Sequence, residues 1–403
     1  MTDSRISRFV SDGFEKAKGG DALAIYAAVT NYHDSGILPE KSHYAFGWII
    51  YYALHQSIEK DIGARKEMLA RYFRLKLTVP HKLHSMILTE AIRLYKDVKN
   101  LSYGRNQKEL TTFSIVRFLE LWNTENLRPG DWNRKQLDGK PLSSTVEKLI
   151  TSYVDEIESS RSTPSSKFLE VIDKAVSYYP DSFNILSQRA AIHIINHDNE
   201  KGAELLRKAL LVAPGKFFLW QRLAMTVSPL EKPHLHVALL YKALISPGQE
   251  QFKGRIRLSL AEVLISRGAF PQALWELQKI RAIYDSNGWH IPVKVNYFLN
   301  KIPDGTIADN PERLYKKVEY LAEEEIYDSL PWLHVVKTYH KHPVSETASP
   351  FKTKPAAAWR VTDNDGNNFW LQPHRFKIDP SLPLGTPLFI RIHNGKAVKA
   401  KLT

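Results

Sequence analysis

A chain of 403 residues is too long for one ordinary hydrophobic core, so two or three domains are expected, and a hydrophobic content of 43% is enough to fill their cores. The absence of cysteine excludes disulfides and Cys-ligated metal centres and fits a reducing, cytoplasmic compartment. The start of the chain lacks the apolar stretch of a secretory leader, and no apolar run approaches the ~18 residues that span a bilayer, so we expect a cytoplasmic protein without a membrane segment.

The net charge of +13 is concentrated in two blocks of the chain. Residues 61–140 hold 16 Lys and Arg against 9 Asp and Glu, and residues 331–403 hold 11 against 4. Clustered positive charge predicts attraction to polyanions such as nucleic acid, but the same charge also serves solubility alone. Composition does not decide between these two interpretations.

Residues 1–122 are predicted to form an N-terminal helical domain of degenerate helical hairpins. Long segments place apolar residues at i, i+3 and i+4 spacing and alternate with short breaks. Tyr44, Trp48 and Tyr51 lie on one such stripe, so we expect helical core there and not a platform on which bases stack. Pro and Gly residues cluster at 123–144, which predicts a loop or an insertion before the next domain.

The basic residues between positions 65 and 82 are interpreted differently, because ionised side chains are rarely buried. They surround the apolar face of one predicted helix and its C-terminal end, so none of them is expected in a core. A solvated face and an anion-binding patch both fit this placement. The set comprises Arg65, Lys66, Arg71, Arg74, Lys76 and Lys82, and the nucleic-acid-binding candidates within it are Arg71, Arg74 and Lys76.

Between residues 145 and 300 the chain returns to the pattern Lys-Ala-apolar every 34 residues. It reads KAVSYYP from Lys174, KALLVAP from Lys208 and KALISPG from Lys242. Such a period predicts a helix–turn–helix unit that stacks on copies of itself. Alanine recurs at fixed positions because small side chains let neighbouring helices approach closely. The alanines of the pattern are Ala175, Ala190, Ala209, Ala224 and Ala243, and Ala261 and Ala273 belong to a fourth unit that comes three residues late.

This pattern resembles the tetratricopeptide repeat, which combines a large residue and small residues in its two helices with a closing proline. Trp220 matches the large residue, and Pro180 and Pro214 match the closing position. The resemblance implies an α-solenoid over residues 145–300, whose concave groove is lined by the first helices and holds a protein partner. The groove candidates that it implies are Gln188, Arg189, Arg222, Arg257 and Glu262.

Residues 301–328 are predicted to form a connecting helix, and residues 329–403 a small all-β barrel. Short alternating segments, HRFKI among them, predict strands. Gly366 and the pair Asn394-Gly395 supply the turn chemistry of hairpins. Closure into a barrel removes the exposed edges, so no helix is needed to cover the sheet.

The segment FWLQPHRFKI followed by LPLGTPLFIRIHNGKAVKAKL resembles the oligonucleotide-binding fold in its cold-shock or S1-like form. The resemblance implies a barrel that binds RNA or single-stranded DNA, with Trp359, Phe369 or Trp370 stacking on bases. Since alternate residues of a strand face opposite sides, one of the pair Phe369 and Trp370 is expected on the surface. The residues expected to meet phosphates are His374, Arg375, Lys377, Arg391 and Lys399.

No sequence motif for catalysis or metal binding is present: the chain has no P-loop, no His-Glu-x-x-His and no nucleophile elbow. The stretch Asp363-Asn364-Asp365-Gly366 begins like a calcium loop but lacks the later Gly and Glu, so a hairpin turn is expected. We therefore expect no enzyme, no cofactor and no metal.

The sequence predicts a mostly α protein, a helical-hairpin repeat superhelix followed by a small all-β barrel. The function that follows is a non-catalytic adaptor for a protein partner and for RNA or single-stranded DNA, a combination that suits bacterial stress-response or defence systems. A protein–protein scaffold without nucleic-acid binding, and an accessory protein or enzyme with an unrecognised site, are the alternatives.

Overall fold

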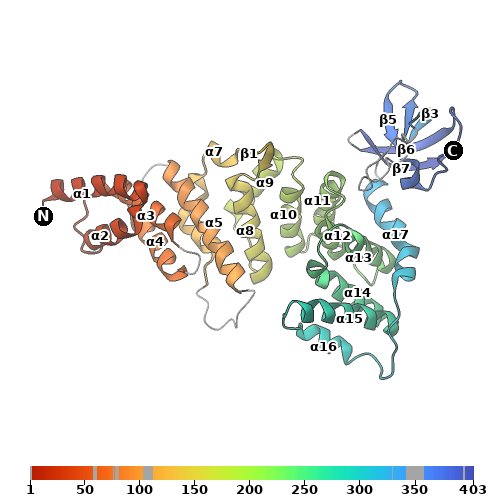
Figure 1. Ribbon diagram of the computed structural model, residues 1–403, viewed down its shortest axis with the longest axis horizontal. Coiled ribbons are helices and arrows are strands. Elements are labelled where there is room, and N and C mark those ends of the chain that lie inside the picture. Colours follow the sequence, from red (N-terminus) through yellow and green to blue (C-terminus); the bar gives the residue numbers. More distant parts are fainter. Residues whose placement is uncertain are drawn as a thin grey trace, which may run out of the picture. The chain divides into compact units, whose positions relative to one another are not determined.

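The protein divides into two units, residues 1–202 and residues 203–403 (Figure 1). The computed structural model describes residues 2–57, 61–75, 77, 81–102, 112–328, 330–341, 358–393 and 395–403. Helices predominate as far as residue 327, and a five-stranded curled sheet follows them. The predicted fold class is thereby confirmed.

Unit 1 is a series of helices with one small hairpin. Its elements are α1 (Asp3–Lys16), the π-helical turn η1 (Ala17–Asp21), α2 (Ala22–Asp34), η2 (Glu40–Ser42), α3 (His43–Gln56), α4 (Ile62–Arg74), α5 (Lys82–Ser102), α6 (Ile115–Trp122), η4 (Thr124–Asn126), α7 (Pro129–Trp132), β1 (Lys135–Leu137), β2 (Lys140–Leu142), α8 (Thr145–Ser160), α9 (Ser166–Tyr178) and α10 (Phe183–Ile195). The predicted loop at 123–144 thus contains a short helix and a β-hairpin.

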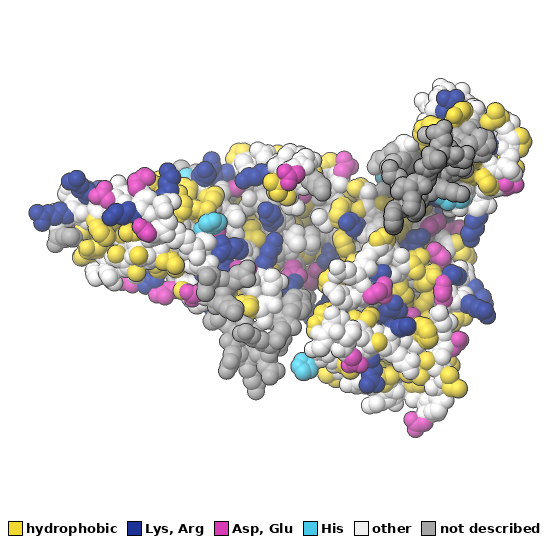
Figure 2. Space-filling model, viewed as in Figure 1, with side chains coloured by type: hydrophobic (Ala, Val, Ile, Leu, Met, Phe, Trp, Pro, Cys, Tyr) yellow, Lys and Arg dark blue, Asp and Glu magenta, His cyan; other side chains and the backbone are white. Residues whose placement is uncertain are grey.

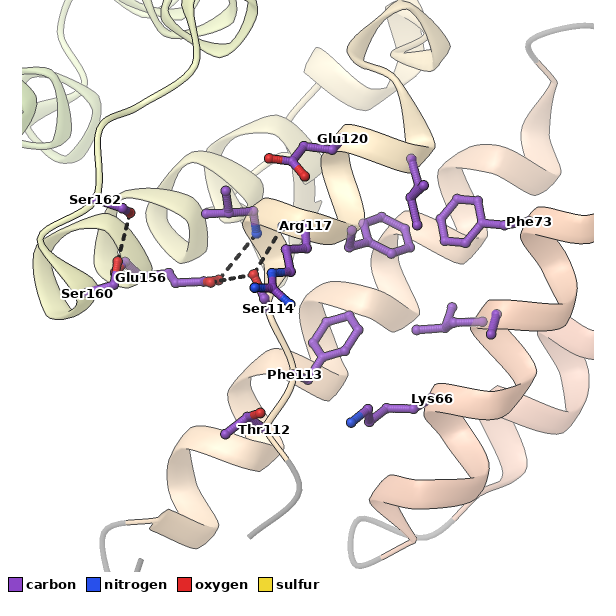
Figure 3. Close-up of a pocket in the computed structure, with 15 residues that line it drawn as sticks. Lys66, Phe73, Thr112, Phe113, Ser114, Arg117, Glu120, Glu156, Ser160 and Ser162 are labelled. Carbon is purple, nitrogen blue, oxygen red and sulfur yellow. Dashed lines mark hydrogen bonds between the residues drawn. The ribbon is translucent and has the colours of Figure 1, made fainter.

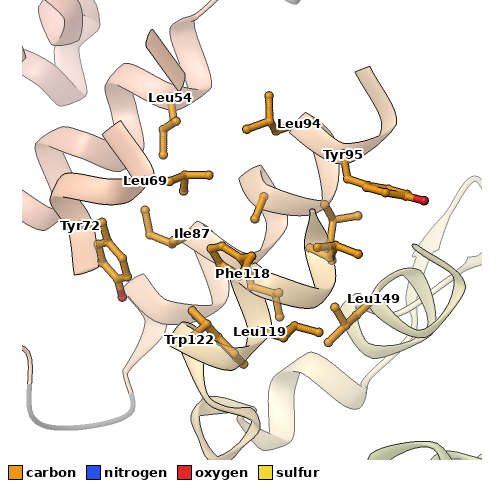
Figure 4. Close-up of a cluster of buried hydrophobic side chains, with 14 of the residues drawn as sticks. Leu54, Leu69, Tyr72, Ile87, Leu94, Tyr95, Phe118, Leu119, Trp122 and Leu149 are labelled. Carbon is orange, nitrogen blue, oxygen red and sulfur yellow. The ribbon is translucent and has the colours of Figure 1, made fainter. Parts of the chain in front are cut away.

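A continuous apolar core runs through unit 1. In Figure 4 the side chains Phe118 and Trp122 of α6 point toward those of α4 and α5. Trp122 is buried, and its indole Nε1 donates a hydrogen bond of 3.2 Å to the carbonyl oxygen of His84. Tyr51 belongs to this core as predicted, whereas Tyr44 is exposed and packs edge-on against His81 at 4.7 Å.

The burial of Arg65 contradicts the expectation that none of the basic residues between positions 65 and 82 lies in a core. The Arg65 side chain is fully buried between α4 and α5, where Nη1 lies 2.7 Å from Asp97 Oδ2. Arg93 lies in the same region and donates to the Ser57 carbonyl oxygen at 2.9 Å. A buried cation is tolerated here because a carboxylate partner compensates its charge.

The junction between the hairpin and α8 is held by a capping box. The hydroxyl of Ser144 accepts from the Glu147 amide, and Glu147 Oε2 accepts from the Ser144 amide at 2.8 Å. Arg134 donates to the same carboxylate at 3.0 Å. Although burial alone would raise the pKa of Glu147, these hydrogen bonds lower it below its usual value.

Unit 2 begins with stacked helical hairpins. Its helical elements, with α11 spanning the border of the two units, are α11 (Asn199–Val212), α12 (Phe217–Met225), α13 (Pro233–Ile245), η5 (Glu250–Lys253), α14 (Gly254–Ser266), α15 (Phe270–Ser286), α16 (Val293–Leu299) and α17 (Glu312–Tyr327). Helix α12 packs against α13, and α14 packs against α15. All the alanines of the 34-residue pattern are fully buried, as close helix packing requires.

Helix α17 lies along α13 and is fixed to it by rings and charges (Figure 1). The Tyr315 ring lies 5.1 Å from that of Tyr241, and its hydroxyl donates to the buried Glu276 carboxylate at 3.1 Å. Lys242 pairs with Glu323 at 2.8 Å. Within the predicted connecting segment 301–328, α17 is thus a packed part of unit 2.

The C-terminal sheet closes into a small barrel. Its elements are β3 (Leu333–Lys341), β4 (Ala358–Asp363), β5 (Asn368–Leu371), η6 (Pro373–Phe376), β6 (Pro387–His393) and β7 (Lys396–Leu402). The strand order is β3-β4-β5-β7-β6, and β6 returns to β3. All pairs are antiparallel except β5 with β7, which is a single parallel pair, Trp370 with Lys396.

Two segments of the barrel can be compared with the predictions from the sequence. Gly366 has φ +81° and the Asp363 carboxylate accepts from the Asn367 amide at 2.8 Å, so this loop is the expected hairpin turn. The segment HRFKI was expected to be a strand, but Pro373 begins a 3₁₀ helix and Lys377 ends it at φ +55°. The fixed φ of proline favours the first position of a helix, which explains the difference. Asn394 lies outside the described residues.

Within the described part of the chain, every helix is too short or too polar to traverse a lipid bilayer.

The buried alanines generate a stability prediction. We expect Ala224→Leu to destabilise the protein by about 1–3 kcal/mol, because extra methylenes at a fully buried helix contact force the helices apart. Urea unfolding followed by circular dichroism measures the shift. Ala282→Leu, at an exposed position of α15, is the matched control and should leave the midpoint unchanged. Equal midpoints for both variants would contradict the packing role.

Candidate nucleic-acid interface

The side chains of β4 and β5 alternate between the inside and the outside of the barrel. Trp359 and Leu371 point inward and are fully buried, whereas Trp370 points outward and is 55% exposed. Phe369 is partly buried and packs against the barrel core, so the expectation that one of Phe369 and Trp370 is on the surface is confirmed. Trp359 is not available for stacking on a base. It fills the barrel interior, with the ammonium of Lys337 lying 4.1 Å from its ring centroid.

An aromatic row, defined by Tyr339, Arg360 and Trp370, crosses three neighbouring strands on the outside of the barrel. Tyr339 of β3 pairs with Arg360 of β4, which pairs with Trp370 of β5. The two rings are edge-on at 6.5 Å, and the guanidinium of Arg360 lies 5.5 Å from the Tyr339 centroid. Tyr339 is 46% exposed, and Arg360 is exposed as well. The row therefore presents two rings and one cation to solvent.

Sequence reasoning missed Tyr339 and Arg360. Arg360 follows the inward Trp359, so alternation marks it as outward, whereas strict alternation from the inward Lys337 would place Tyr339 inside the barrel. Their pairing depends on a register shift between Lys337 and Tyr339, where β3 bulges. A bulge re-aims side chains at the point where it occurs, and the sequence carries no clear signal for it.

Polar side chains lie beside the aromatic row. The hydroxyls of Thr338 and Thr362 are 2.9 Å apart, and the Thr362 hydroxyl donates to Asn368 Oδ1 at 2.9 Å. All three residues have solvent access. They supply donors and acceptors next to the rings, which is what a surface that contacts base edges needs.

The basic candidates of the barrel divide into available and engaged side chains. His374, Arg375 and Lys377 are exposed on η6 and directly after it. Arg391 is buried instead. Its Nη1 donates to the Tyr327 carbonyl oxygen at 2.6 Å and to the Asp328 carboxylate, so it is not the phosphate contact expected from the sequence.

Lys399 is likewise partly engaged, because its ammonium lies 4.0 Å from Glu324 of α17. This is the outer limit of an ion pair, and the lysine side chain retains partial exposure. It contributes to the positive field of the barrel while lying close to an acidic helix.

The basic candidates of unit 1 are less available than the sequence suggests. Arg71 is held by Asp34 at 2.8 Å, by the Tyr26 hydroxyl at 2.7 Å and by Glu67 at 2.8 Å. Arg74 is exposed, and Lys76 lies outside the described residues. On the visible face in Figure 2, Lys and Arg side chains of unit 1 are interspersed with hydrophobic and acidic ones.

The groove candidates also differ in availability. Gln188 and Arg189 lie on α10, where Arg189 pairs with Asp173 at 2.8 Å, and Arg222 is half-buried on α12. Arg257 and Glu262 lie on α14.

Arg257 serves the interior of unit 2. It bridges Glu250 and the buried Glu276, at 2.8 Å from each carboxylate. Glu262 is exposed and pairs with Lys294 of α16 at 2.8 Å. Glu262 therefore lies at the surface of the repeat region, and Arg257 does not.

A pocket of about 750 Å³ lies in unit 1 between α4, α6 and the end of α8 (Figure 3). Lys66 and Arg117 are the cations at its rim. Glu156 accepts hydrogen bonds from the Ser114 hydroxyl at 2.5 Å and the Ile115 amide at 2.7 Å. This carboxylate is thus engaged in holding the start of α6. Among the described residues, no group of three or more His, Asp or Glu side chains is placed to hold a metal ion.

One family model matches part of the chain. Residues 188–322 match the family described as "Domain of unknown function (DUF7017)". The matched segment begins within α10 and ends within α17, so it covers repeat helices and stops before the barrel. No curated protein matches the chain.

The engaged state of Arg71 leads to a prediction about titration. Hydrogen bonds from Arg71 hold the pKa of Asp34 at about 2, well below its usual value, so the stabilisation by this pair is present above about pH 4 and is lost as the pH falls toward 2. In Arg71→Met we expect the pKa of Asp34 to rise toward about 3.9, measured by NMR titration of labelled aspartate carboxyls. Arg74→Met, on the same helix, should leave it at about 2. An unchanged pKa in Arg71→Met would contradict this account.

Proposed function

We propose that the protein is a non-catalytic adaptor, with a barrel that binds RNA or single-stranded DNA and helical repeats that bind a protein partner. The observation that carries the nucleic-acid part is the aromatic row, in which two exposed rings flank an exposed arginine across three paired strands. Bases stack on such rings whatever their identity, and the cation meets the phosphate backbone.

The topology of the barrel supports this proposal. An oligonucleotide-binding fold is a five-stranded Greek-key barrel that binds its ligand on the face of its second and third strands. Here the second and third strands are β4 and β5, and they carry Arg360 and Trp370. The order β3-β4-β5-β7-β6 with a parallel β5–β7 contact fits that arrangement.

The positive charges near β5 also support binding on the face of β4 and β5. Arg375 and Lys377 are exposed in the segment that follows β5. Phosphate contacts by Lys and Arg release counterions, so the affinity should fall with salt. This requirement separates nucleic-acid binding from a barrel that serves only as a protein docking module.

Trp370→Ala tests the aromatic row. Loss of one stacking contact costs about 1–3 kcal/mol, so we expect the affinity for a fluorescein-labelled twelve-nucleotide single strand to fall about 5- to 150-fold. Fluorescence anisotropy at low salt measures it. Trp289→Ala removes an exposed tryptophan outside the barrel and should bind like the unmodified chain.

Arg360→Ala tests the cation of the row. The slope of log affinity against log salt should decrease by about 1, because one phosphate contact is lost. A chain that shows no salt-dependent binding of RNA or DNA would refute the nucleic-acid function and favour the protein scaffold.

The protein-binding part rests on the stacked hairpins, which we propose to be tetratricopeptide-like. Repeats of this kind present an extended binding surface on one side of the stack. Helix α17 packs on α13, a second helix of a hairpin, and the first helix α12 keeps Met225 exposed beside the half-buried Arg222. An apolar side chain with a neighbouring cation suits a protein ligand.

Capture experiments test this part. We expect a partner recovered from a lysate of the source organism to remain bound after nuclease treatment, and to be lost with the double variant Arg222→Glu, Met225→Glu. Lys316→Glu on α17 is the control, since Lys316 is exposed on a different helix. Partners that nuclease releases would be bridged by nucleic acid and would not support a protein-binding groove.

A further inference from the structure

We propose that the single strand continues from the aromatic row along β3 to a second stacking site on the opposite flank of that strand. This second row is defined by His334, Phe389 and Lys401. The inference rests on the proposed nucleic-acid function and extends it, because it assigns the route and the minimum length of the ligand.

The second row has the same construction as the aromatic row. His334 of β3 pairs in register with Phe389 of β6, which pairs with Lys401 of β7. The rings of His334 and Phe389 are edge-on at 5.5 Å, and the Lys401 ammonium lies 5.7 Å from the Phe389 centroid. Both rings have partial solvent access, and Lys401 is exposed. Two rings and a cation are again presented outside the barrel.

Strand β3 joins the two rows because it pairs with β4 on one side and β6 on the other. Val335 and Lys337 point into the barrel and are buried, so His334, Val336 and Thr338 face outward. The bulge after Lys337 then turns Tyr339 outward as well. The outward side of β3 is therefore a continuous track from one row to the other.

The length of this track sets the size of the ligand. Five residue steps separate His334 from Tyr339, which corresponds to about 16 Å along a strand. One stacked base covers a single ring, so a ligand must contain several nucleotides to contact both rows. Oligonucleotide-binding folds occupy about 4–16 nucleotides, a range that accommodates this path.

The charges along the track also favour a polyanion. The sequences of β3, β6 and β7 contain no Asp or Glu, and Lys401 of β7 is exposed, whereas Lys337 of β3 and Arg391 of β6 are buried and do not face the track. A phosphate backbone that follows β3 meets no carboxylate from these three strands. Lys401 also lies 4.6 Å from the Trp332 ring, so the competing explanation is that the second row only packs the end of the barrel.

Oligonucleotide length distinguishes these explanations. The experiment measures fluorescence anisotropy of the full chain with labelled oligothymidylates of three and of twelve nucleotides, because three nucleotides are fewer than the path between the two rows needs. The short strand should occupy the aromatic row, whose rings are the more exposed, and the long strand should contact both rows. Phe389→Leu keeps an apolar side chain at this partly buried position but removes the ring. We expect it to weaken the long strand about 5-fold or more and to leave the short strand unchanged.

A second variant of the row and a control variant accompany Phe389→Leu. Lys401→Ala changes an exposed residue, so it should fold normally, and it should reduce the salt slope by about 1 for the long strand only. Tyr297 of α16 is an exposed ring with the Lys301 ammonium close to it, so it combines a ring and a cation outside the barrel. Tyr297→Leu removes this ring and should change the affinity for neither oligonucleotide.

The outcomes separate this inference from the proposed function. If both strands bind but Phe389→Leu and Lys401→Ala weaken both equally or neither, the second row is only packing and the inference fails alone. If the unmodified chain binds neither strand, the nucleic-acid function itself fails. Selective loss of the long strand in both variants supports the extended path.

Discussion

The narrow interior of the barrel is the constraint on which the candidate interface depends. A small barrel has room for side chains and little else, and here Trp359 takes much of that space with the Lys337 ammonium held over its ring. Because successive residues of a strand alternate, an inward Trp359 forces Arg360 outward, and an inward Leu371 forces Trp370 outward. The surface chemistry of β4 and β5 is thus a consequence of how the core is filled. A change in which residues of β4 and β5 face the core would therefore also change which residues face solvent.

The acidic helix α17 determines which basic residues of unit 2 remain available. Its carboxylates engage Lys242 and Arg207 of the repeat helices, and Asp328 just beyond it engages Arg391 of the barrel. Arg391 also donates to the Tyr327 carbonyl at the end of α17, where a cation is favourable to the helix dipole. These contacts explain why basic residues that look equivalent in the sequence have different roles. Some fasten elements of unit 2 to each other, and others face solvent.

Much of the fold follows from local sequence signals, and most of the interface does not. The alanines at a period of 34 predict closely packed helices because only small side chains fit there, and alternation predicts that one of Phe369 and Trp370 is exposed. The failures have a common origin in tertiary context. Arg65 is buried because Asp97, more than thirty positions later, faces it, and Tyr339 meets Arg360 only through a bulge. Such partners are set by long-range packing, which no local pattern encodes.

The two basic blocks of the sequence show why net charge alone does not locate a binding surface. In unit 1, Arg65, Arg71 and Arg134 are each paired with a carboxylate, so their charge stabilises the helices and is locally compensated. On the barrel, Arg360 and Lys401 lie against aromatic rings and pair with no carboxylate among the described residues. A cation over a ring keeps its long-range field while the ring supplies a stacking face. That combination, rather than the count of positive charges, distinguishes a surface suited to a nucleic-acid strand from one that only keeps the protein in solution.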